Sequence, residues 1–535
     1  MSWSEGRISR GLRLVLDVLV LGLAARQVGM LLWVFWQRVG YPYDIEWMEG
    51  ATLISALRVT QGLPLYGAPE PTYIPFIYPP LYAWVVAACS TVFPFGYALA
   101  RSVSIAGTLV AAAALVFAGR EAGARWSTAI AGAAIFLGTW EETGTFFDLV
   151  RIDGLSIGLI AWALVLAAGR TPARAIAGGV VLAVAFACKH HAAIFGFPVV
   201  LALWHRDGRA HALRFGLAAA IPAVLFVIGM QVGTGGRFLL WLVEVPSHHG
   251  IVANRFFPWI AVTSLSPLKY EVSGAATEVI KAMPLAWLAA FAVAVHARND
   301  AAGLKASPRF GYWLGVSVVG LFVVSLMRGH VGGFTNVLIP MMWIQALWPS
   351  LASRRAGEGL GGMALSALVA AQVWLGGSDY KREIPTQADR RQTDALIEEL
   401  RALPGPVLLP HAPYYAVIAG HEPSFALIAL WDVSDDSVPR AAAPVAVTRA
   451  LRSKHWASGV FPAAKPGSGV EKSYVRARAL VHKGPPTLTG WRVKLADVWS
   501  PKDGESKAGD GKPGDDKPGD EKPADEKPAD EKPGE

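Results

Sequence analysis

The chain has 535 residues, of which 53% are hydrophobic and 17% are charged, and its mean hydropathy is +0.37. This composition excludes an ordinary soluble globular protein, and we expect a polytopic membrane protein embedded in a lipid bilayer. The net charge of the chain is +8. Its tail, residues 501–535, has 7 Lys and 12 acidic residues and so a charge of −5, which leaves +13 for the rest of the chain. We attribute this positive excess to membrane topology and not to a nucleic-acid partner.

Apolar runs that are long enough to span a membrane, or nearly so, recur from the N-terminus to about residue 376. Several are nearer 14 than 20 residues long, and short or broken spans usually line a cavity. We therefore predict an all-α transmembrane domain over residues 1–376 with about 11 helices. The expected spans are 14–36, 102–118, 127–140, 154–169, 175–188, 191–204, 215–231, 283–296, 310–327, 334–351 and 360–376.

Arg and Lys in the short loops predict the orientation, because cytoplasmic loops are enriched in these residues. A cytoplasmic N-terminus makes every cytoplasmic loop short and basic, provided that residues 79–97 do not cross. That stretch follows Tyr78 and is interrupted by Pro94 and Gly96, so we expect a juxtamembrane or re-entrant segment. An odd number of spans then places the C-terminal part on the extracytoplasmic side. The Ala-, Gly- and Arg-rich composition suggests a bacterial inner membrane.

Residues 377–499 are predicted to form a small extracytoplasmic α/β module. Its pattern indicates a helix at Gln392–Leu403, a short strand at Pro406–Leu409 and a helix or turn at Tyr414–Gly420. Residues 500–535 repeat Asp-Glu-Lys-Pro-Ala and Lys-Pro-Gly-Asp units, which contain no large apolar side chain, so we expect a disordered tail.

The first candidate site is an acidic segment in the first outer loop, residues 37–101. Asp44 and Glu46 are two residues apart, which would put both on one side of an extended segment, and Glu49 follows one helical turn later as the expected bystander. A carboxylate here could accept a proton from an acceptor hydroxyl or bind a divalent cation. The alternative interpretation is a solvated acidic loop without a chemical role.

A second candidate is Arg151-Ile-Asp153, directly before the span at 154. Asp153 could simply cap the helix with Arg151 as its partner. Alternatively, Asp153 orients the first-loop acid or a metal while Arg151 binds phosphate.

Basic and polar residues mark three further positions on the same predicted face. Lys189, His190 and His191 lie between two short spans, where an unpaired cation is costly and an anionic ligand such as phosphate would be favourable; interfacial snorkelling of the lysine is the alternative. His248 and His249 could bind phosphate or metal. In the stretch 328–336, His330 and Asn336 accompany two glycines that permit close approach to a head group or form a plain interfacial loop.

Four motifs together resemble the GT-C superfamily of integral-membrane glycosyltransferases, particularly protein O-mannosyltransferases and aminoarabinose lipid A transferases. The likeness covers about residues 10–350. The motifs are Asp44-Ile-Glu46, Gly62-Leu-Pro-Leu-Tyr66 followed by Tyr78-Pro-Pro-Leu81, Arg151-Ile-Asp153, and the stretch from Gly329-His330 to Pro340.

The resemblance implies an inverting transfer of a sugar from a polyprenyl-phosphate-linked donor to a lipid, glycan or protein acceptor on the non-cytoplasmic face. It makes Asp44 the expected catalytic base, Glu46 the alternate and Asp153 the second acid. The implied phosphate-binding residues are Lys189, Arg151 and one of His248 or His330. Tyr78 stands where some relatives have Lys, which weakens a phosphate-binding role for that position.

No cofactor follows with certainty from the sequence, and a divalent metal ion at Asp44 and Glu46 stays open. Two other functions also stay open. A secondary transporter for a sugar or anion would share broken spans and buried basic residues, although it should show internal repeats, and none is visible. A catalytically silent GT-C relative acting as an assembly partner is the third possibility.

Overall fold

The structure is a computed structural model that describes residues 3–252, 255, 275–299, 308–356, 359–377, 380–433, 438, 441–463 and 469–502. Residues 1–501 form one compact unit. The predicted disordered tail lies outside the described residues from residue 503 onward, and so do residues 256–274.

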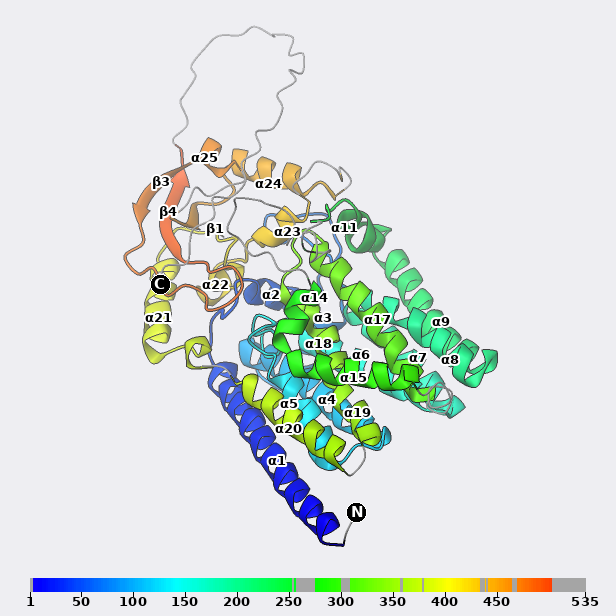
Figure 1. Ribbon diagram of the computed structural model, residues 1–535. Coiled ribbons are helices and arrows are strands. Elements are labelled where there is room, and N and C mark those ends of the chain that lie inside the picture. The colour runs from blue at the N-terminus through cyan, green and yellow to red at the C-terminus, as the bar shows by residue number, and fades with distance from the viewer. Residues whose placement is uncertain are drawn as a thin grey trace, which may run out of the picture. The chain divides into compact units, whose positions relative to one another are not determined.

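Helices dominate the described part of the chain (Figure 1), and every apolar run predicted to span the membrane falls on helical structure. The predicted helical class is therefore confirmed. The helices up to residue 247 are α1 (Trp3–Val39), α2 (Glu49–Thr60), α3 (Leu81–Cys89), α4 (Tyr97–Glu121), α5 (Trp126–Leu137), α6 (Ile152–Ala168), α7 (Pro172–Cys188), η1 (His190–Phe195), α8 (Gly196–Asp207), α9 (Arg209–Gly233), α10 (Arg237–Leu239), η2 (Leu240–Glu244) and α11 (Val245–Ser247).

The second half of the bundle is more broken than the first. The expected span 334–351, for example, is divided among three short helices. The helices here are α14 (Ala275–Ala282), α15 (Pro284–Asn299), α17 (Pro308–Gly329), η3 (Thr335–Leu338), α18 (Ile339–Ala346), α19 (Trp348–Ala356) and α20 (Leu360–Leu375).

Four helices of the described residues are long and apolar enough to cross a bilayer, within α1, α4, α9 and α17. The number rises to six if each of two bent helix pairs is one span, and α14 with α15 bends by 95°. Three apolar helices, α5, α6 and α7, have only 12 to 17 residues. The protein is thus a membrane protein, while the predicted total of 11 spans stays a prediction.

The surface of α9 shows most directly that the bundle faces lipid. This helix has 25 residues, and its most apolar 18-residue stretch has a mean hydropathy of 2.1, yet only 6% of that stretch is buried. Leu217, Ile221, Leu225 and Ile228 each expose more than half of their surface. An apolar surface of this size would be unstable in water and is typical of contact with a bilayer.

The segment 79–97 contains only the nine-residue helix α3 before α4 begins. A nine-residue helix rises about 14 Å, which is less than half of a bilayer core of about 30 Å. This length agrees with the prediction that residues 79–97 do not cross.

Glycines let α4 and α6 approach each other closely at the end of the bundle that carries the candidate site. A Cβ atom at Gly107 would lie 2.4 Å from the carbonyl oxygen of Gly154, and one at Gly158 would lie 2.5 Å from that of Gly107. Small residues at such contacts are typical of membrane helix pairs. The Ser104 hydroxyl of α4 also donates to the Arg151 carbonyl (2.9 Å), which fixes the start of α6.

The C-terminal residues form a small mixed α/β region. Its helices are η4 (Tyr380–Glu383), α21 (Gln387–Arg401), α22 (Pro413–Ile418), α23 (Leu427–Trp431), α24 (Ala443–Arg452) and α25 (Val470–Ser473), and its strands are β1 (Val407–Leu408), β2 (Ser458–Pro462), β3 (Tyr474–Ala479) and β4 (Leu495–Pro501). The sheet order is β1-β2-β4-β3, with β1 parallel to β2 and the other pairs antiparallel. The predicted helix at Gln392–Leu403 and strand at Pro406–Leu409 are confirmed.

This C-terminal region packs on the end of the bundle where α2 and α11 lie, away from the N-terminus of α1 (Figure 1). Its buried side chains share one hydrophobic core with the acidic first-loop segment and with residues 238–245. Tyr43 contacts Tyr415 with ring centroids 5.7 Å apart, and the backbone of Leu488 donates to the carbonyl of Ile45. The region therefore rests directly on the acidic segment.

Candidate functional site

A buried ion pair shapes the acidic segment. The Glu49 carboxylate accepts two hydrogen bonds from Arg101 of α4 (2.9 and 2.7 Å), and both side chains are fully buried. Glu49 also accepts from the backbone N–H groups of Ile45 (2.6 Å) and Val150 (2.8 Å). Burial would raise the pKa of Glu49, but Arg101 outweighs it and holds the pKa below its usual value. Glu49 thus joins the first loop to the loop before α6.

All three acids of the segment are buried, so the solvated-loop interpretation is wrong. Asp44, Glu46 and Glu49 expose 5%, 1% and 0% of their surface. Burying a carboxylate costs free energy unless specific partners compensate it. The segment is therefore built to hold carboxylates away from water.

Asp44 and Glu46 do not share one side of an extended strand, contrary to the prediction. Asp44 Oδ1 accepts from the backbone of Gly50 and the hydroxyl of Tyr97, both at 2.8 Å, while its Oδ2 has no hydrogen-bond partner. Glu46 Oε2 lies 3.6 Å from Arg151 Nη1. The backbone turns between the two acids because it enters α2 at Glu49 instead of continuing extended.

The carboxyl pKa values of the two acids are both raised. Burial is the larger cause for Asp44, followed by the charge of Glu49. Burial raises the pKa of Glu46 to about 7, although Arg151 acts in the opposite direction. A carboxyl group with a pKa near 7 can act as a general base at neutral pH.

Asp153 is the meeting point of three parts of the chain. Its Oδ1 accepts from Lys189 Nζ (2.8 Å) and from Asn336 Nδ2 (3.0 Å). Arg151, not Asp153, is the residue that precedes the first turn of α6, and the Asp153 side chain makes no cap. The helix-cap interpretation of Asp153 is therefore wrong, and Lys189 has its anionic partner within the protein.

Lys189 reaches Asp153 because the chain is extended between α7 and η1. α7 ends at Cys188, Lys189 has φ −150° and ψ 113°, and η1 then leads into α8. The break between the two short helices was expected from their lengths. It aims the lysine into the protein at the start of α6.

Tyr78 and Asp432 border the same polar cluster. Burial raises the pKa of Tyr78 to about 12, against the charge of Arg151. Burial also raises the pKa of Asp432 to about 7, and Arg151 again acts in the opposite direction. Asp432 follows α23 in the C-terminal region, so it brings that region to the candidate site.

The remaining candidate histidines have separate positions. His249 bonds through Nε2 to the carbonyl of Asp432 (2.8 Å), and its ring lies 4.8 Å from that of His330. His248 is exposed and bonds to the carbonyl of Glu244 through Nδ1. Among the described residues, no hydrogen-bond partner is found for either ring nitrogen of His191 or for Nδ1 of His190.

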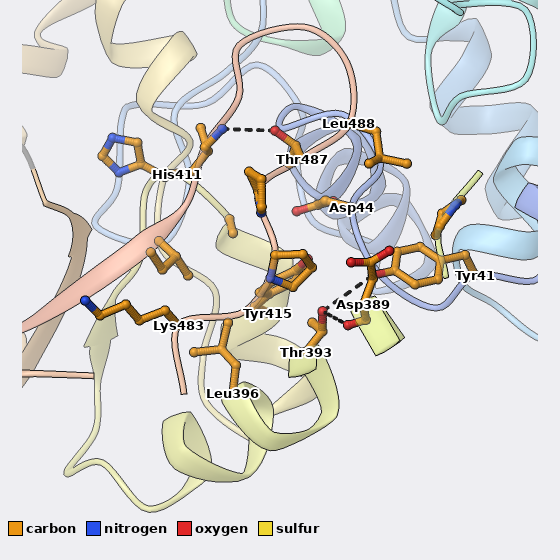
Figure 2. Close-up of a pocket in the computed structure, with 16 residues that line it drawn as sticks. Tyr41, Asp44, Asp389, Thr393, Leu396, His411, Tyr415, Lys483, Thr487 and Leu488 are labelled. Carbon is orange, nitrogen blue, oxygen red and sulfur yellow. Dashed lines mark hydrogen bonds between the residues drawn. The ribbon is translucent and has the colours of Figure 1, made fainter. Parts of the chain in front are cut away.

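One cavity is bordered by Arg151 and another by Asp44. One has about 490 Å³ of empty space, open solvent included, and is bordered mainly by aromatic and apolar residues together with Arg151; they include Leu65, Tyr66, Tyr73, Phe76, Tyr78, Pro79, Pro80, Tyr82 and Ile152. The other has about 530 Å³ and lies under the C-terminal region. Figure 2 shows Asp44 and Tyr415 at this second cavity, with Asp389 and Lys483 on its C-terminal side.

Among the described residues, no group of three or more His, Cys, Asp or Glu side chains is placed to hold a metal ion. Asp44 and Glu46, the pair considered for a divalent cation, have separate partners.

Sequence reasoning missed three contributors to this site. Arg101 lies at the end of the predicted first outer loop, and no spacing indicates that it pairs with Glu49. Asp432 and Gly490 come from the C-terminal region, where a Cβ atom at Gly490 would lie only 2.8 Å from Glu46 Oε1. The positive φ of Gly490 (69°) is the one local signal, since it favours glycine at a close approach.

Comparison with solved structures gives the fold. ArnT from Cupriavidus metallidurans bound to undecaprenyl phosphate aligns with a TM-score of 0.56 and 14% identity, over 89% of this chain and 98% of that chain. The apo state of the same ArnT gives 0.50 and 15%, over 90% and 98%. The chain shares the fold of ArnT. AglB from Archaeoglobus fulgidus, in complex with an inhibitory peptide and a dolichol-phosphate, aligns with a TM-score of 0.43 and 12% identity, over 80% and 65%.

No family model matches the sequence, and no curated protein matches it. The shared fold nevertheless agrees with the fold that the resemblance of the four short motifs implies. Within this fold, the motif residues Glu46, Arg151 and Asp153 lie together with Lys189 and Asn336. Asp44 lies apart from them, beside the cavity under the C-terminal region.

Proposed function

We propose that the protein is a glycosyltransferase that moves a sugar from a polyprenyl-phosphate-linked donor to a cell-envelope acceptor, with inversion at the anomeric carbon. The observation that carries the proposal is the joining of two basic side chains, Arg151 and Lys189, to the buried acids Glu46 and Asp153 in a GT-C fold. The similar ArnT structure contains undecaprenyl phosphate. We place the reaction on the non-cytoplasmic face of a bacterial inner membrane, with the N-terminus cytoplasmic and the C-terminus extracytoplasmic.

Arg151 is the proposed ligand of the donor phosphate. Among the described residues, its buried Nη1 has no hydrogen-bond partner, and it lies 3.6 Å from Glu46, which is too long for a hydrogen bond. A guanidinium can offer two parallel N–H groups to a phosphate. Lys189 pairs with Asp153, so its proposed role is to hold Asp153 in place and to offset its negative charge near the phosphate.

The cavity beside Arg151 is the proposed entrance of the polyprenyl tail. Its aromatic and apolar lining suits an isoprenoid chain, and Arg151 at its border suits the phosphate that ends such a chain. Tyr78 borders the same cavity. In this arrangement, the isoprenoid tail of the donor contacts an apolar surface and its phosphate contacts a cation.

Glu46, the alternate in the sequence prediction, is the base that we propose in preference to Asp44. Glu46 lies next to Arg151, and a pKa of about 7 suits proton transfer near neutral pH. In the proposed reaction, Glu46 takes the proton of the acceptor hydroxyl while that oxygen bonds to the anomeric carbon. The bond to the donor phosphate oxygen breaks, and polyprenyl phosphate leaves with both electrons of that bond.

Binding of undecaprenyl phosphate to the purified protein in nanodiscs, followed by native mass spectrometry, tests the donor site. Arg151→Gln should weaken binding, whereas Arg151→Lys should retain part of it, because the charge remains. Arg452→Gln, on the exposed surface of α24, is the matched control. Equal binding by the Arg151→Gln variant and the wild type would reject Arg151 as the phosphate ligand.

Turnover requires a second measurement. Undecaprenyl-phosphate-linked sugars and isolated envelope material are incubated with the nanodiscs, and released undecaprenyl phosphate is measured by mass spectrometry. Release that depends on envelope material supports the transferase. Binding without release would instead indicate a catalytically silent relative, and sugar uptake by proteoliposomes without release would indicate a transporter; either result contradicts the proposed enzyme.

A further inference from the structure

Three tryptophans from distant parts of the chain touch one another beside Glu46. The ring centroids of Trp431 and Trp491 are 5.2 Å apart at an interplanar angle of 33°. Trp47 meets Trp491 edge-on at 5.1 Å and Trp431 at 5.9 Å. Trp431 and Trp491 expose 46% and 44% of their surface, while Trp47 is buried beneath them. We call these three indoles the aromatic platform.

The backbone that carries Trp491 is fixed to the proposed base. Thr489 pairs with Glu46 in a parallel β-bridge, and the Thr489 hydroxyl donates to the carbonyl of Gly144 (2.8 Å). Any side chain at Gly490 would collide with Glu46 Oε1, so the loop touches the carboxylate itself. Glu46 Oε2 faces Arg151, on the proposed donor side. The platform therefore adjoins Glu46 through Gly490 and Trp47.

Hydrogen-bonding groups stand at both ends of the platform. Asp432 follows Trp431 directly and is close enough to Arg151 for the arginine charge to act on its pKa. At the other end, the His411 ring lies 5.6 Å from Trp491. His411 is 4% exposed, and its Nδ1 has no hydrogen-bond partner. His411 also borders the cavity of Figure 2, together with Asp44.

We propose that the aromatic platform binds a sugar ring of the acceptor, so that the acceptor is a glycan. This inference rests on the proposed function, because it gives the second substrate of the same site a chemical class. A pyranose ring has a face of C–H groups, which packs on the electron-rich face of an indole, and a rim of hydroxyl groups. The rim needs hydrogen-bonding partners, which Asp432 and His411 supply.

The surroundings favour a sugar over a lipid chain. A lipid chain would need a long apolar groove, whereas the exposed indoles end at Asp432 on one side. The position next to Glu46 also fits an acceptor, since the hydroxyl that loses its proton must reach this carboxylate.

Saturation-transfer difference NMR on the full-length protein in nanodiscs tests the platform without turnover. The probes are the methyl glycosides of glucose, galactose and mannose, with an acetylated Ser-Thr dipeptide amide as the peptide arm. We expect signals from the ring C–H protons of at least one glycoside. Trp431→Ala and Trp491→Ala should each weaken its affinity by about 2- to 10-fold, because stacked rings contribute a modest free energy.

The controls separate stacking from folding. Trp431→Phe and Trp491→Phe keep an aromatic face and should retain most of the signal. Trp374→Ala removes an indole of α20 that is 62% exposed and far in sequence from the platform, and should change nothing. Native mass spectrometry of undecaprenyl phosphate should be unchanged in all these variants, which shows that they are folded.

Each other outcome overturns the proposal. Absence of any glycoside signal, while undecaprenyl phosphate still binds, rejects the platform and leaves the proposed function standing. A signal from the dipeptide alone indicates a protein acceptor. If the alanine variants lose undecaprenyl-phosphate-linked sugar but still bind undecaprenyl phosphate, the platform holds the donor sugar instead.

Discussion

Replacing Arg151 by Gln should move the acid limb of the pH–rate profile to higher pH. As the base, Glu46 is active only when it is deprotonated, so turnover should fall as pH decreases through its pKa of about 7. Arg151 lowers that pKa, because its positive charge stabilises the carboxylate. Loss of the charge therefore raises the pKa, and the limb shifts upward.

The 3.6 Å separation between Arg151 Nη1 and Glu46 Oε2 sets the size of the shift. Coulomb's law at that distance gives about 1 kcal/mol at the dielectric constant of water and about 5 kcal/mol at an effective value of 20. Since one pKa unit corresponds to about 1.4 kcal/mol, the expected shift is about 1 to 3 pH units.

The assay is kcat at saturating undecaprenyl-phosphate-linked donor from about pH 5 to 9, which covers the wild-type limb and an upward shift of about 1 to 2 pH units. Arg151→Lys should bring the limb back toward its wild-type position, because it restores a positive charge. Arg452→Gln serves as the distant control. An active Arg151→Gln variant with an unshifted limb would refute the reasoning, and so would a wild-type profile without an acid limb.

Substitutions at four other positions probe the cluster. Glu46→Gln should lower turnover by about 10²–10⁴-fold. Asp44→Asn should cost less, since its Oδ1 accepts hydrogen bonds that an amide oxygen can also accept; initial rates at saturating donor compare the two, and the opposite order would restore Asp44 as base. Glu49→Gln leaves Arg101 buried without its charge partner and should destabilise the protein by about 3–5 kcal/mol, seen as a lower melting temperature in detergent; unchanged melting contradicts this. Lys189→Met should raise the donor KM more than Lys189→Arg, and equal values would argue against a charge effect.

The helices, and the proximity of several candidate residues, could be predicted from the sequence. Apolar runs identify helices because a span must hide its backbone polar groups, and the break at Lys189 followed from the shortness of its two neighbours. The meeting of Arg151, Asp153 and Lys189 followed from placing their loops on one face. The number of spans could not be predicted in the same way, since one apolar run can be divided among several short helices such as α18 and α19.

The sequence could not show which acidic side chain pairs with which basic side chain. Asp44 and Glu46 are separated by one residue, and the turn into α2 sends them to different partners. Glu49, expected to be a bystander, is instead held by Arg101, 52 residues away. Gly490 and Asp432 lie at the site because the C-terminal region packs there. Such a contact between distant parts of the chain cannot be predicted from a local sequence pattern.

Mass spectrometry of envelope glycans in a deletion strain tests the central claim most directly. The strain should lack one sugar substituent, and a plasmid carrying the wild-type gene should restore it. A plasmid carrying Glu46→Gln, at equal protein abundance in the membrane, should not. An unchanged envelope in the deletion strain, or full restoration by the Glu46→Gln variant, would contradict a sugar transfer that depends on Glu46.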